Sequence, residues 1–277
     1  MTDLNEMQKY LSTAETVSRD AGKLINDAFQ NHSKNVMTKD SSVDLVTVTD
    51  QQCEDLIKKT LLETYPDHKF IGEESTAAGA KNELTDLPTW IVDPLDGTTN
   101  FVHGFPYVSV CIGLTIKKKV VLGVVYAPIL DEMYTAIRGQ GATLNGTSLS
   151  VSKCTGLKNA LVCTEIGSNR ESPHIDIVRD NYYRMAVAPC HSVRSLGAAA
   201  MNMCMVAKGA CDAYYEFGIH AWDYCAASII VEEAGGYCCD TTGTELDLMA
   251  RKIACGATPA LMKEITDTLT DITMPRD

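Results

Sequence analysis

The chain has 277 residues, of which 45% are hydrophobic and 22% are charged, and its formal net charge is −12. A chain of this length can bury about three quarters of the surface that it exposes when unfolded, so we expect a large core without disulfides. The acidic balance argues against nucleic acid or an anionic membrane as a partner, because both repel an acidic surface unless cations intervene. An anionic substrate would therefore need a metal ion beside it.

The cysteines predict an intracellular protein. There are eleven of them, an odd number, and no CxxC pair occurs. This pattern favours reduced thiols that fill the core over a disulfide framework or a structural zinc site. The sequence opens without a basic stretch followed by an apolar one, and its longest apolar stretches, 108–116 and 120–130, are too short to span a bilayer. We therefore expect a cytoplasmic protein.

The chain begins with a predicted helix. Apolar residues recur at every third or fourth position from Leu4 to Phe29, which is typical of an amphipathic helix on a sheet. The polar segment 31–45 lacks this period and predicts an exposed loop. The stretch VTVTD, 46–50, then alternates like the end of a strand.

A second helix and an antiparallel sheet are expected next. The helix follows Asp50 and stops before Pro66. A short strand then ends in GEES at 72–75. Between 107 and 137, β-branched and apolar residues separated by turns predict three antiparallel strands.

Strand-like and helix-like stretches alternate beyond residue 150, as in a layered α/β unit. Strands are expected at ALVCTE, HSVR, DAYYEF and KIACG, and helices at 173–186, AAAMNMCMVAKG and WDYCAASIIVEEAGG. We place a soft boundary near 150, so that residues 1–150 and 151–277 form two halves of one compact unit.

Three acidic motifs stand out: GEES at 72–75, DPLDGT at 93–98 and WD at 222–223. Pro94 favours an extended conformation at Asp93, so Asp93 is expected to end a strand, with both aspartates projecting from one rigid corner. Any one motif alone is typical of a turn or a helix N-terminus. Together they offer the hard oxygen ligands of Mg²⁺ or Ca²⁺, without the spacing of an EF-hand. Magnesium fits best.

The same region offers a site for phosphate. Neither GxxxxGK[ST] nor GxGxxG occurs in the sequence. Gly97, Thr98 and Thr99 follow the second aspartate directly. If a helix begins there, its free N–H groups can hold phosphate oxygens beside the metal.

The motifs GEES, WIVDPLDGTTNFVHGFP, GVVY, DAYYEFGIHAWD and EEAGG occur in this order. Their sequence resembles that of the magnesium-dependent, lithium-sensitive phosphatases of the inositol monophosphatase family, over essentially the whole chain. The resemblance implies an α/β fold, a layered αβαβα sandwich, and usually a homodimer. It also implies hydrolysis of a phosphomonoester by metal-activated water, with no covalent enzyme intermediate.

The resemblance further implies roles for single residues. The implied metal ligands are Glu73, Asp93, Asp96, Asp223 and the main-chain carbonyl of Leu95, with support from Glu74. The residues implied to orient or deprotonate the attacking water are Asp50 and Thr98, which act beside Glu73. The implied phosphate and sugar contacts are Gly97 and Thr98 for the phosphate, and Ser168, Gly197, Ala199, Glu216 and Lys39 for the sugar.

Other interpretations of four residues remain open. His103 and His220 lie beside the acidic motifs, but Mg²⁺ prefers oxygen, so we expect a core or hydrogen-bonding role for both. Without the resemblance, Glu216 could simply cap its strand, and Lys39 could be a solvated loop charge.

The leading functional hypothesis is hydrolysis of inositol monophosphate to inositol and inorganic phosphate. A related alternative is another small phosphomonoester, such as a sugar phosphate, histidinol phosphate or a nucleotide 3′-phosphate, because the metal core is indifferent to the leaving alcohol. The stretch DAYYEFGIHAWD favours inositol. A hypothesis of a different class is a non-catalytic, metal-dependent binding protein on the same fold.

Overall fold

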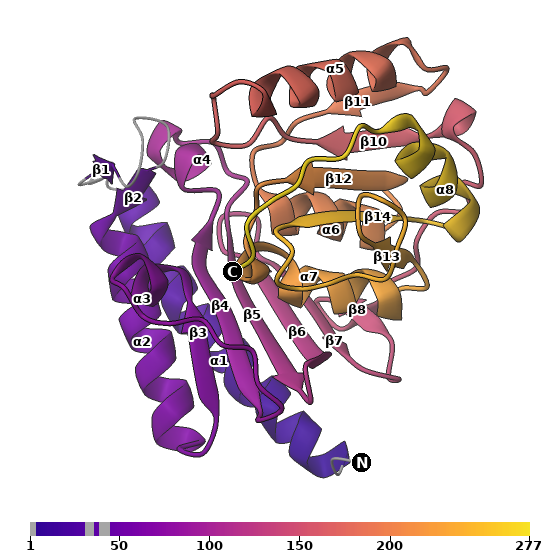
Figure 1. The fold of residues 1–277 in the computed structure, drawn as a ribbon. Helices are drawn as coiled ribbons and strands as arrows, with labels where there is room; N and C mark the ends of the chain where they lie inside the picture. The colour runs from indigo at the N-terminus through magenta and orange to yellow at the C-terminus, as the bar shows by residue number, and fades with distance from the viewer. Residues whose placement is uncertain (1–3, 31–35, 39–44) are drawn as a thin grey trace.

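Two helices, α1 (Leu4–Gln30) and α2 (Val48–Thr64), form the first layer of the fold (Figure 1). The computed structural model describes residues 4–30, 36–38 and 45–277. Helix α1 buries one stripe that includes Ala14 and Ile25 and exposes its other face, as expected of a helix that packs on a sheet. The predicted first helix is confirmed.

The second layer is a seven-stranded sheet in the order β3-β4-β5-β6-β7-β8-β9. Its strands are β3 (Lys69–Gly72), β4 (Thr89–Asp96), β5 (Ser109–Ile116), β6 (Lys119–Ala127), β7 (Glu132–Ile137), β8 (Ala142–Leu144) and β9 (Thr147–Ser148). Strand β3 runs parallel to β4, and every later neighbour is antiparallel. The three strands predicted between 107 and 137 are confirmed as β5, β6 and β7.

The third layer consists of α6 (Ala199–Ala207) and α7 (Ala221–Glu233), which lie between the two sheets (Figure 1). Helix α7 is buried almost all round, because it contacts β5 and β6 on one side and β13 and β14 on the other. Its close approach depends on Gly113 and Gly123, which are register partners on β5 and β6. A Cβ atom on Gly123 would lie 2.2 Å from the carbonyl oxygen of Ala226, and one on Gly113 would lie 2.5 Å from Cys225 Sγ. We call this glycine pair the α7 seat.

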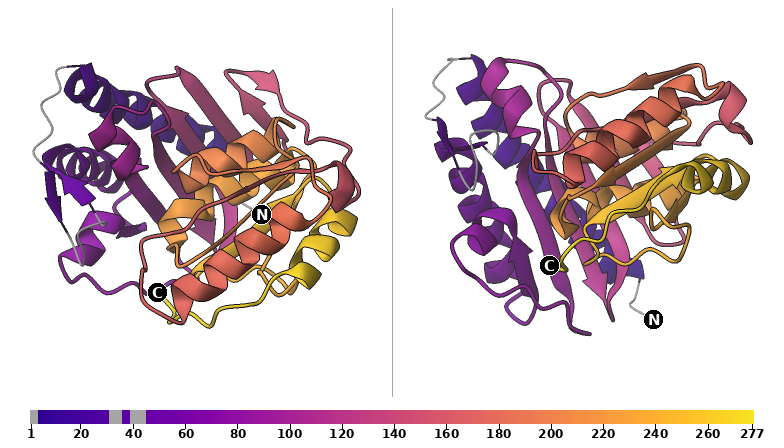
Figure 2. Two further views of the ribbon diagram at one scale, coloured as in Figure 1. Left: turned by 90° about the horizontal axis from the view of Figure 1, so that it is seen from above. Right: turned by 45° about the horizontal axis from the view of Figure 1, so that its top comes forward.

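The fourth and fifth layers close the sandwich. The second sheet has the order β11-β10-β12-β14-β13. Its strands are β10 (Leu161–Thr164), β11 (Ser192–Arg194), β12 (Ala213–Phe217), β13 (Tyr237–Cys239) and β14 (Lys252–Gly256). Figure 2 shows α5 (His174–Val187) and α8 (Pro259–Thr268) on the face of this sheet that points away from α6 and α7. The expected αβαβα sandwich is confirmed, as are all the predicted strands and helices of the second half; β13 and α8 are additional.

The stretch VTVTD, 46–50, departs from the prediction. Strand β2 (Leu45–Thr47), which pairs with β1 (Val36–Thr38), ends at Thr47, and α2 begins at once. The reason is a capping box: the Thr47 hydroxyl accepts from the N–H of Thr49, and the Asp50 carboxylate accepts from the N–H of Thr47 at 2.9 Å. Asp50 therefore lies in the first turn of a helix, and β1 occupies part of the predicted loop. Residues 31–35 and 39–44 lie outside the described ranges.

The cysteines fill the core, as expected. All eleven are free thiols, and nine of them are buried. Within the described ranges, no helix combines the length and the apolar composition that crossing a membrane requires.

The α7 seat generates a stability prediction. Gly123→Ala inserts a methyl group where no space exists, so it should lower the free energy of unfolding by about 1–3 kcal/mol. The melting temperature should fall by about 2–4 °C for each kcal/mol lost. The matched control is Gly156→Ala, since a Cβ atom there has its nearest neighbour at 3.4 Å. Equal melting temperatures for the two variants in a calorimetric scan would show that α7 does not need the seat.

Candidate active site

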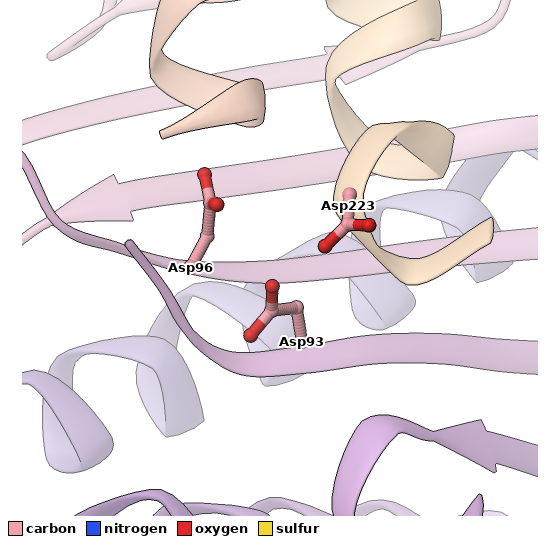
Figure 3. Close-up of side chains that lie close together, drawn as sticks. All are labelled: Asp93, Asp96 and Asp223. Carbon is pink, nitrogen blue, oxygen red and sulfur yellow. The ribbon is translucent and has the colours of Figure 1, made fainter. Parts of the chain in front are cut away.

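An irregularity in β4 places Asp93 and Asp96 on one side of the strand. Asp93 pairs with Cys111 and Asp96 with Ser109, so two residues of β4 lie opposite one of β5. This is a β-bulge, and it contains Pro94, which has no N–H for the ladder. Residues three apart on a regular strand point to opposite faces, but here both carboxylates point to the same space (Figure 3). The prediction that Asp93 ends the strand was wrong, because β4 continues through the bulge to Asp96.

The third carboxylate comes from the other half of the chain. Asp223 lies in the first turn of α7 and points toward the two aspartates of β4 (Figure 3). One carboxylate oxygen from each of Asp93, Asp96 and Asp223 lies within 4.8 Å of the others. We call these three residues the aspartate cluster.

Main-chain N–H groups hold the aspartate cluster in place. Each carboxylate accepts from one main-chain N–H: Leu95 N–H donates to Asp93 Oδ1 (2.9 Å), Ala200 N–H to Asp96 Oδ2 (2.9 Å) and His220 N–H to Asp223 Oδ2 (2.5 Å). Across the described part of the chain, none of the three forms an ion pair with lysine or arginine. The negative charge of the cluster is therefore oriented but not neutralised.

Burial and mutual repulsion make these groups hard to ionise. Burial, and then the neighbouring charge of Glu73, raise the pKa of Asp93 well above the ordinary aspartate value. Burial and the charge of Asp223 raise the pKa of Asp96 in the same way, and burial raises the pKa of Asp223 to about 6. A bound cation would offset both effects, because it stabilises the ionised carboxylates.

Glu73 reaches the same site from α3 (Glu73–Ala77). It borders a cavity of about 730 Å³ together with Asp223. The start of α3 is held by Glu54, a buried residue of α2 whose carboxylate accepts from the N–H groups of Glu74 and Ser75 at 2.7 Å each. Glu54 was not among the predicted site residues, because an acid in mid-helix looks like a solvated charge.

Asp50 and Thr98 are also brought together. The Thr98 hydroxyl lies 3.1 Å from Asp50 Oδ1 and 3.2 Å from the carbonyl oxygen of Leu95, and it can donate to either. Burial raises the pKa of Asp50 to about 6. A carboxylate with this pKa remains ionised at neutral pH and can accept a proton through the hydroxyl.

The predicted helix after Gly97 exists as α4 (Thr98–His103). Gly97 precedes it with φ of 89°, a left-handed conformation that favours glycine, and a Cβ atom there would lie 2.9 Å from the carbonyl oxygen of Tyr107. The first N–H groups of α4 therefore start directly beside Asp96.

The predicted sugar contacts gather around an adjoining cavity of about 510 Å³. Its lining includes Asp96 and Asp223, together with four predicted residues: Ser168, Gly197, Ala199 and Glu216. Glu216 is buried, and the hydroxyl of Tyr214 donates to its carboxylate. The fifth predicted contact, Lys39, lies outside the described residues.

One wall of this cavity depends on Glu165 and Asn100, which sequence reasoning missed. Glu165 Oε1 accepts from the N–H groups of Leu196 (2.7 Å) and Gly197 (2.8 Å). Asn100 Nδ2 donates to the carbonyl oxygen of Leu196 at 2.8 Å. Both residues fix the loop that leads to Ala199. The spacing of residues in the sequence does not predict contacts between segments that lie so far apart in the chain.

The two histidines beside the acidic motifs, His103 and His220, lie in different environments. His220 has the expected hydrogen-bonding role, with its Nδ1 2.5 Å from Asp277 Oδ1. His103 is exposed and borders the smaller cavity, so a core role for it was wrong.

The comparisons with known proteins all match the same family. A profile of the inositol monophosphatase family matches residues 6–274. The chain is 47% identical to human inositol monophosphatase 1 over 270 residues, which cover 98% of this chain and 97% of the human protein. It is 50% identical to inositol monophosphatase 2 of Solanum lycopersicum over 260 residues, which cover 93% and 96% of the two chains.

Solved structures of inositol monophosphatases superpose on this chain over nearly its full length. Inositol monophosphatase from Anabaena superposes with a TM-score of 0.83 at 29% identity, covering 95% of this chain and 96% of the other. SaIMPase-II, in a structure with bound inositol monophosphate, superposes with a TM-score of 0.77 at 26% identity, covering 94% and 92%. The likeness extends over nearly the full length at every level of comparison, and the chain therefore belongs to the inositol monophosphatase family.

Proposed function

We propose that this protein is a phosphoric monoester hydrolase that converts inositol monophosphate to inositol and inorganic phosphate, with Mg²⁺ as its cofactor. The observation that carries the proposal is the aspartate cluster, which borders a cavity that also presents Glu216 and Ser168. The bound inositol monophosphate of SaIMPase-II supports this substrate class. The family resemblance supports a homodimer, and the eleven free thiols support a cytoplasmic location.

The donor set fits magnesium. Among the described residues, the converging side-chain donors are carboxylate oxygens, which Mg²⁺ prefers, and neither cysteine nor histidine is among them. Burial, and then neighbouring negative charge, raise the pKa values of Asp93 and Asp96, and a cation would stabilise the ionised form of both groups. We assign the metal to the aspartate cluster and Glu73, with the carbonyl of Leu95 and the support of Glu74.

When bound, the cation supplies positive charge to the phosphate oxygens and makes water a stronger nucleophile near neutral pH. The residues of the chain supply the proton acceptor and the phosphate contacts. Asp50, through the Thr98 hydroxyl, orients the attacking water and accepts its proton. The N–H groups of Gly97 and Thr98 at the start of α4 hold the phosphate.

We assign the inositol ring to the wall formed by Ser168, Gly197, Ala199 and Glu216, with Lys39 as a further contact. Glu216 is the strongest candidate for specificity, because a buried carboxylate can accept from ring hydroxyls that a flexible substrate lacks. A second candidate substrate is a nucleotide monophosphate, which the 2′-AMP complex of SaIMPase-II favours.

The first prediction concerns the cofactor. Phosphate release should require Mg²⁺ and should be depressed by Li⁺, as the family resemblance implies. The measurement is phosphate released from a panel of inositol monophosphate, a sugar phosphate, histidinol phosphate and nucleotide monophosphates, before and after chelation. Turnover that survives chelation would exclude a metal mechanism, and absence of turnover on the whole panel with Mg²⁺ present would favour the binding-protein hypothesis.

The second prediction concerns specificity. Glu216→Ala should weaken turnover of inositol monophosphate by about ten- to a hundredfold, which corresponds to about 1–3 kcal/mol for a lost buried polar contact. Turnover of glycerol phosphate should change far less, because it presents fewer hydroxyl groups. Glu216→Gln is the isosteric control and should give an intermediate loss. If both substrates lose equally, Glu216 has a structural role.

The third prediction concerns charge in the metal-free site. Asp93→Asn keeps the acceptor for the Leu95 N–H but removes one charge, so it should abolish most activity. Each repelling pair costs on the order of 1 kcal/mol or more. In chelator the variant should therefore melt at the parent temperature or above it, by about 2–4 °C for each kcal/mol relieved. In excess Mg²⁺ the parent should melt higher, because it gains more binding energy in its folded state.

The sign of the pH dependence follows from the raised pKa values. Folded carboxylates with a raised pKa hold protons that the unfolded chain has already released, so the metal-free parent loses stability as the pH rises. In chelator, the difference in melting temperature between the parent and Asp93→Asn should narrow as the pH falls through about 6, where Asp223 takes up protons. A variant that melts well below the parent in chelator would instead make Asp93 a structural cap.

A further inference from the structure

Asp277 lies far from the acidic motifs in sequence but caps the helix that carries Asp223. Its side chain is only 3% exposed. Asp277 Oδ2 accepts from the N–H of Ala221, the first residue of α7, at 2.9 Å. That N–H has no partner within its own helix, and a negative charge is favoured at a helix N-terminus. The segment that follows α8 therefore adds a further cap to the first turn of α7, beside the local capping box of His220 and Asp223.

The second oxygen of Asp277 fixes the ring of His220. Asp277 Oδ1 lies 2.5 Å from His220 Nδ1, and Arg251 Nη2 lies 3.0 Å from His220 Nε2. A guanidinium group only donates, so Nε2 accepts and Nδ1 carries the hydrogen that it donates to Asp277. The ring also stacks on that of Trp222, with centroids 4.5 Å apart and planes at 4°. His220 is thus held at both nitrogens and on one face.

The residue fixed in this way holds a proposed metal ligand. The main-chain N–H of His220 donates to Asp223 Oδ2 at 2.5 Å. A shift of His220 or of the first turn of α7 would move Asp223 relative to the two aspartates of β4. The chain of contacts therefore runs from Asp277 through His220 to the aspartate cluster.

We propose that Asp277 is a positioning residue for the cation site: it sets the place of Asp223 by holding His220 and the first turn of α7. This inference rests on the proposed role of Asp223 as a metal ligand. Partners that orient a metal ligand commonly change metal affinity by about ten- to a hundredfold when removed.

The rival explanation is that Asp277 only anchors the end of the chain. The neighbouring Arg276 makes such an anchor, because its guanidinium pairs with Asp247 at an exposed position. Arg276→Ala therefore removes an anchor from the same segment without touching α7, and it serves as the matched control.

The test is a calorimetric titration of the metal-free, full-length protein with Mg²⁺ alone. Asp277→Ala should weaken Mg²⁺ binding by about tenfold or more, and Asp277→Asn, which keeps one oxygen, should fall between it and the parent. Arg276→Ala should bind Mg²⁺ like the parent. With inositol monophosphate, Asp277→Ala should need a correspondingly higher Mg²⁺ concentration for half-maximal turnover, while its KM for substrate at saturating Mg²⁺ should stay near that of the parent.

The outcomes separate the inference from the proposed function. If the parent itself binds no Mg²⁺, the proposed metal site is wrong. If the parent binds Mg²⁺ and folded Asp277→Ala binds it equally well, only the positioning role is overturned. Should Asp277→Ala fail to fold, Asp277→Asn decides: a lower melting temperature in chelator with unchanged Mg²⁺ affinity would make Asp277 a structural anchor alone.

Discussion

The structure depends on holding like charges together. Asp93, Asp96 and Asp223 converge within 4.8 Å, and among the residues that the structure describes their partners are main-chain N–H donors rather than lysine or arginine. A side-chain cation would neutralise the cluster and compete with any metal for the same oxygens. Peptide dipoles orient the carboxylates and leave most of their charge available. The geometry of the cluster thus fits the cation that we propose for it.

The layers of the fold bring the three aspartates together. The bulge in β4 turns Asp93 and Asp96 to one side, while the α7 seat lets the helix approach until Asp223 meets them. Two further carboxylates, outside the aspartate cluster, also accept from main-chain N–H groups. Glu54 accepts from the start of α3, and Asp277 accepts from the start of α7. Buried acids at helix N-termini therefore recur around the site, and each fixes an element that contributes to it.

Sequence was sufficient where the signal is local. The period of α1 and the alternation of the later strands each reside in a few neighbouring residues, and the structure confirms the elements they predict. The motif DPLDGT predicted that its two aspartates project together, but the strand end predicted at Asp93 was wrong. The resemblance to a known family supplied the proposed roles of Glu216 and Ser168, which no local pattern carries. What escaped prediction is non-local or depends on geometry. The bulge after Asp93, the buried contacts of Glu54 and the cap from Asp277 exist only once distant segments pack together.

The origin of the cluster from two distant segments has a consequence for biosynthesis. Asp93 and Asp96 leave the ribosome early, as part of a sheet whose one face is already covered by α1 and α2. The other face, with the α7 seat, stays open until α7 is made, and until then Asp223 is missing from the cluster. The nascent chain therefore presents an uncovered apolar face and an incomplete set of ligands together. Completion of the aspartate cluster and completion of the core therefore depend on the same late segment, and a chain interrupted before α7 can complete neither.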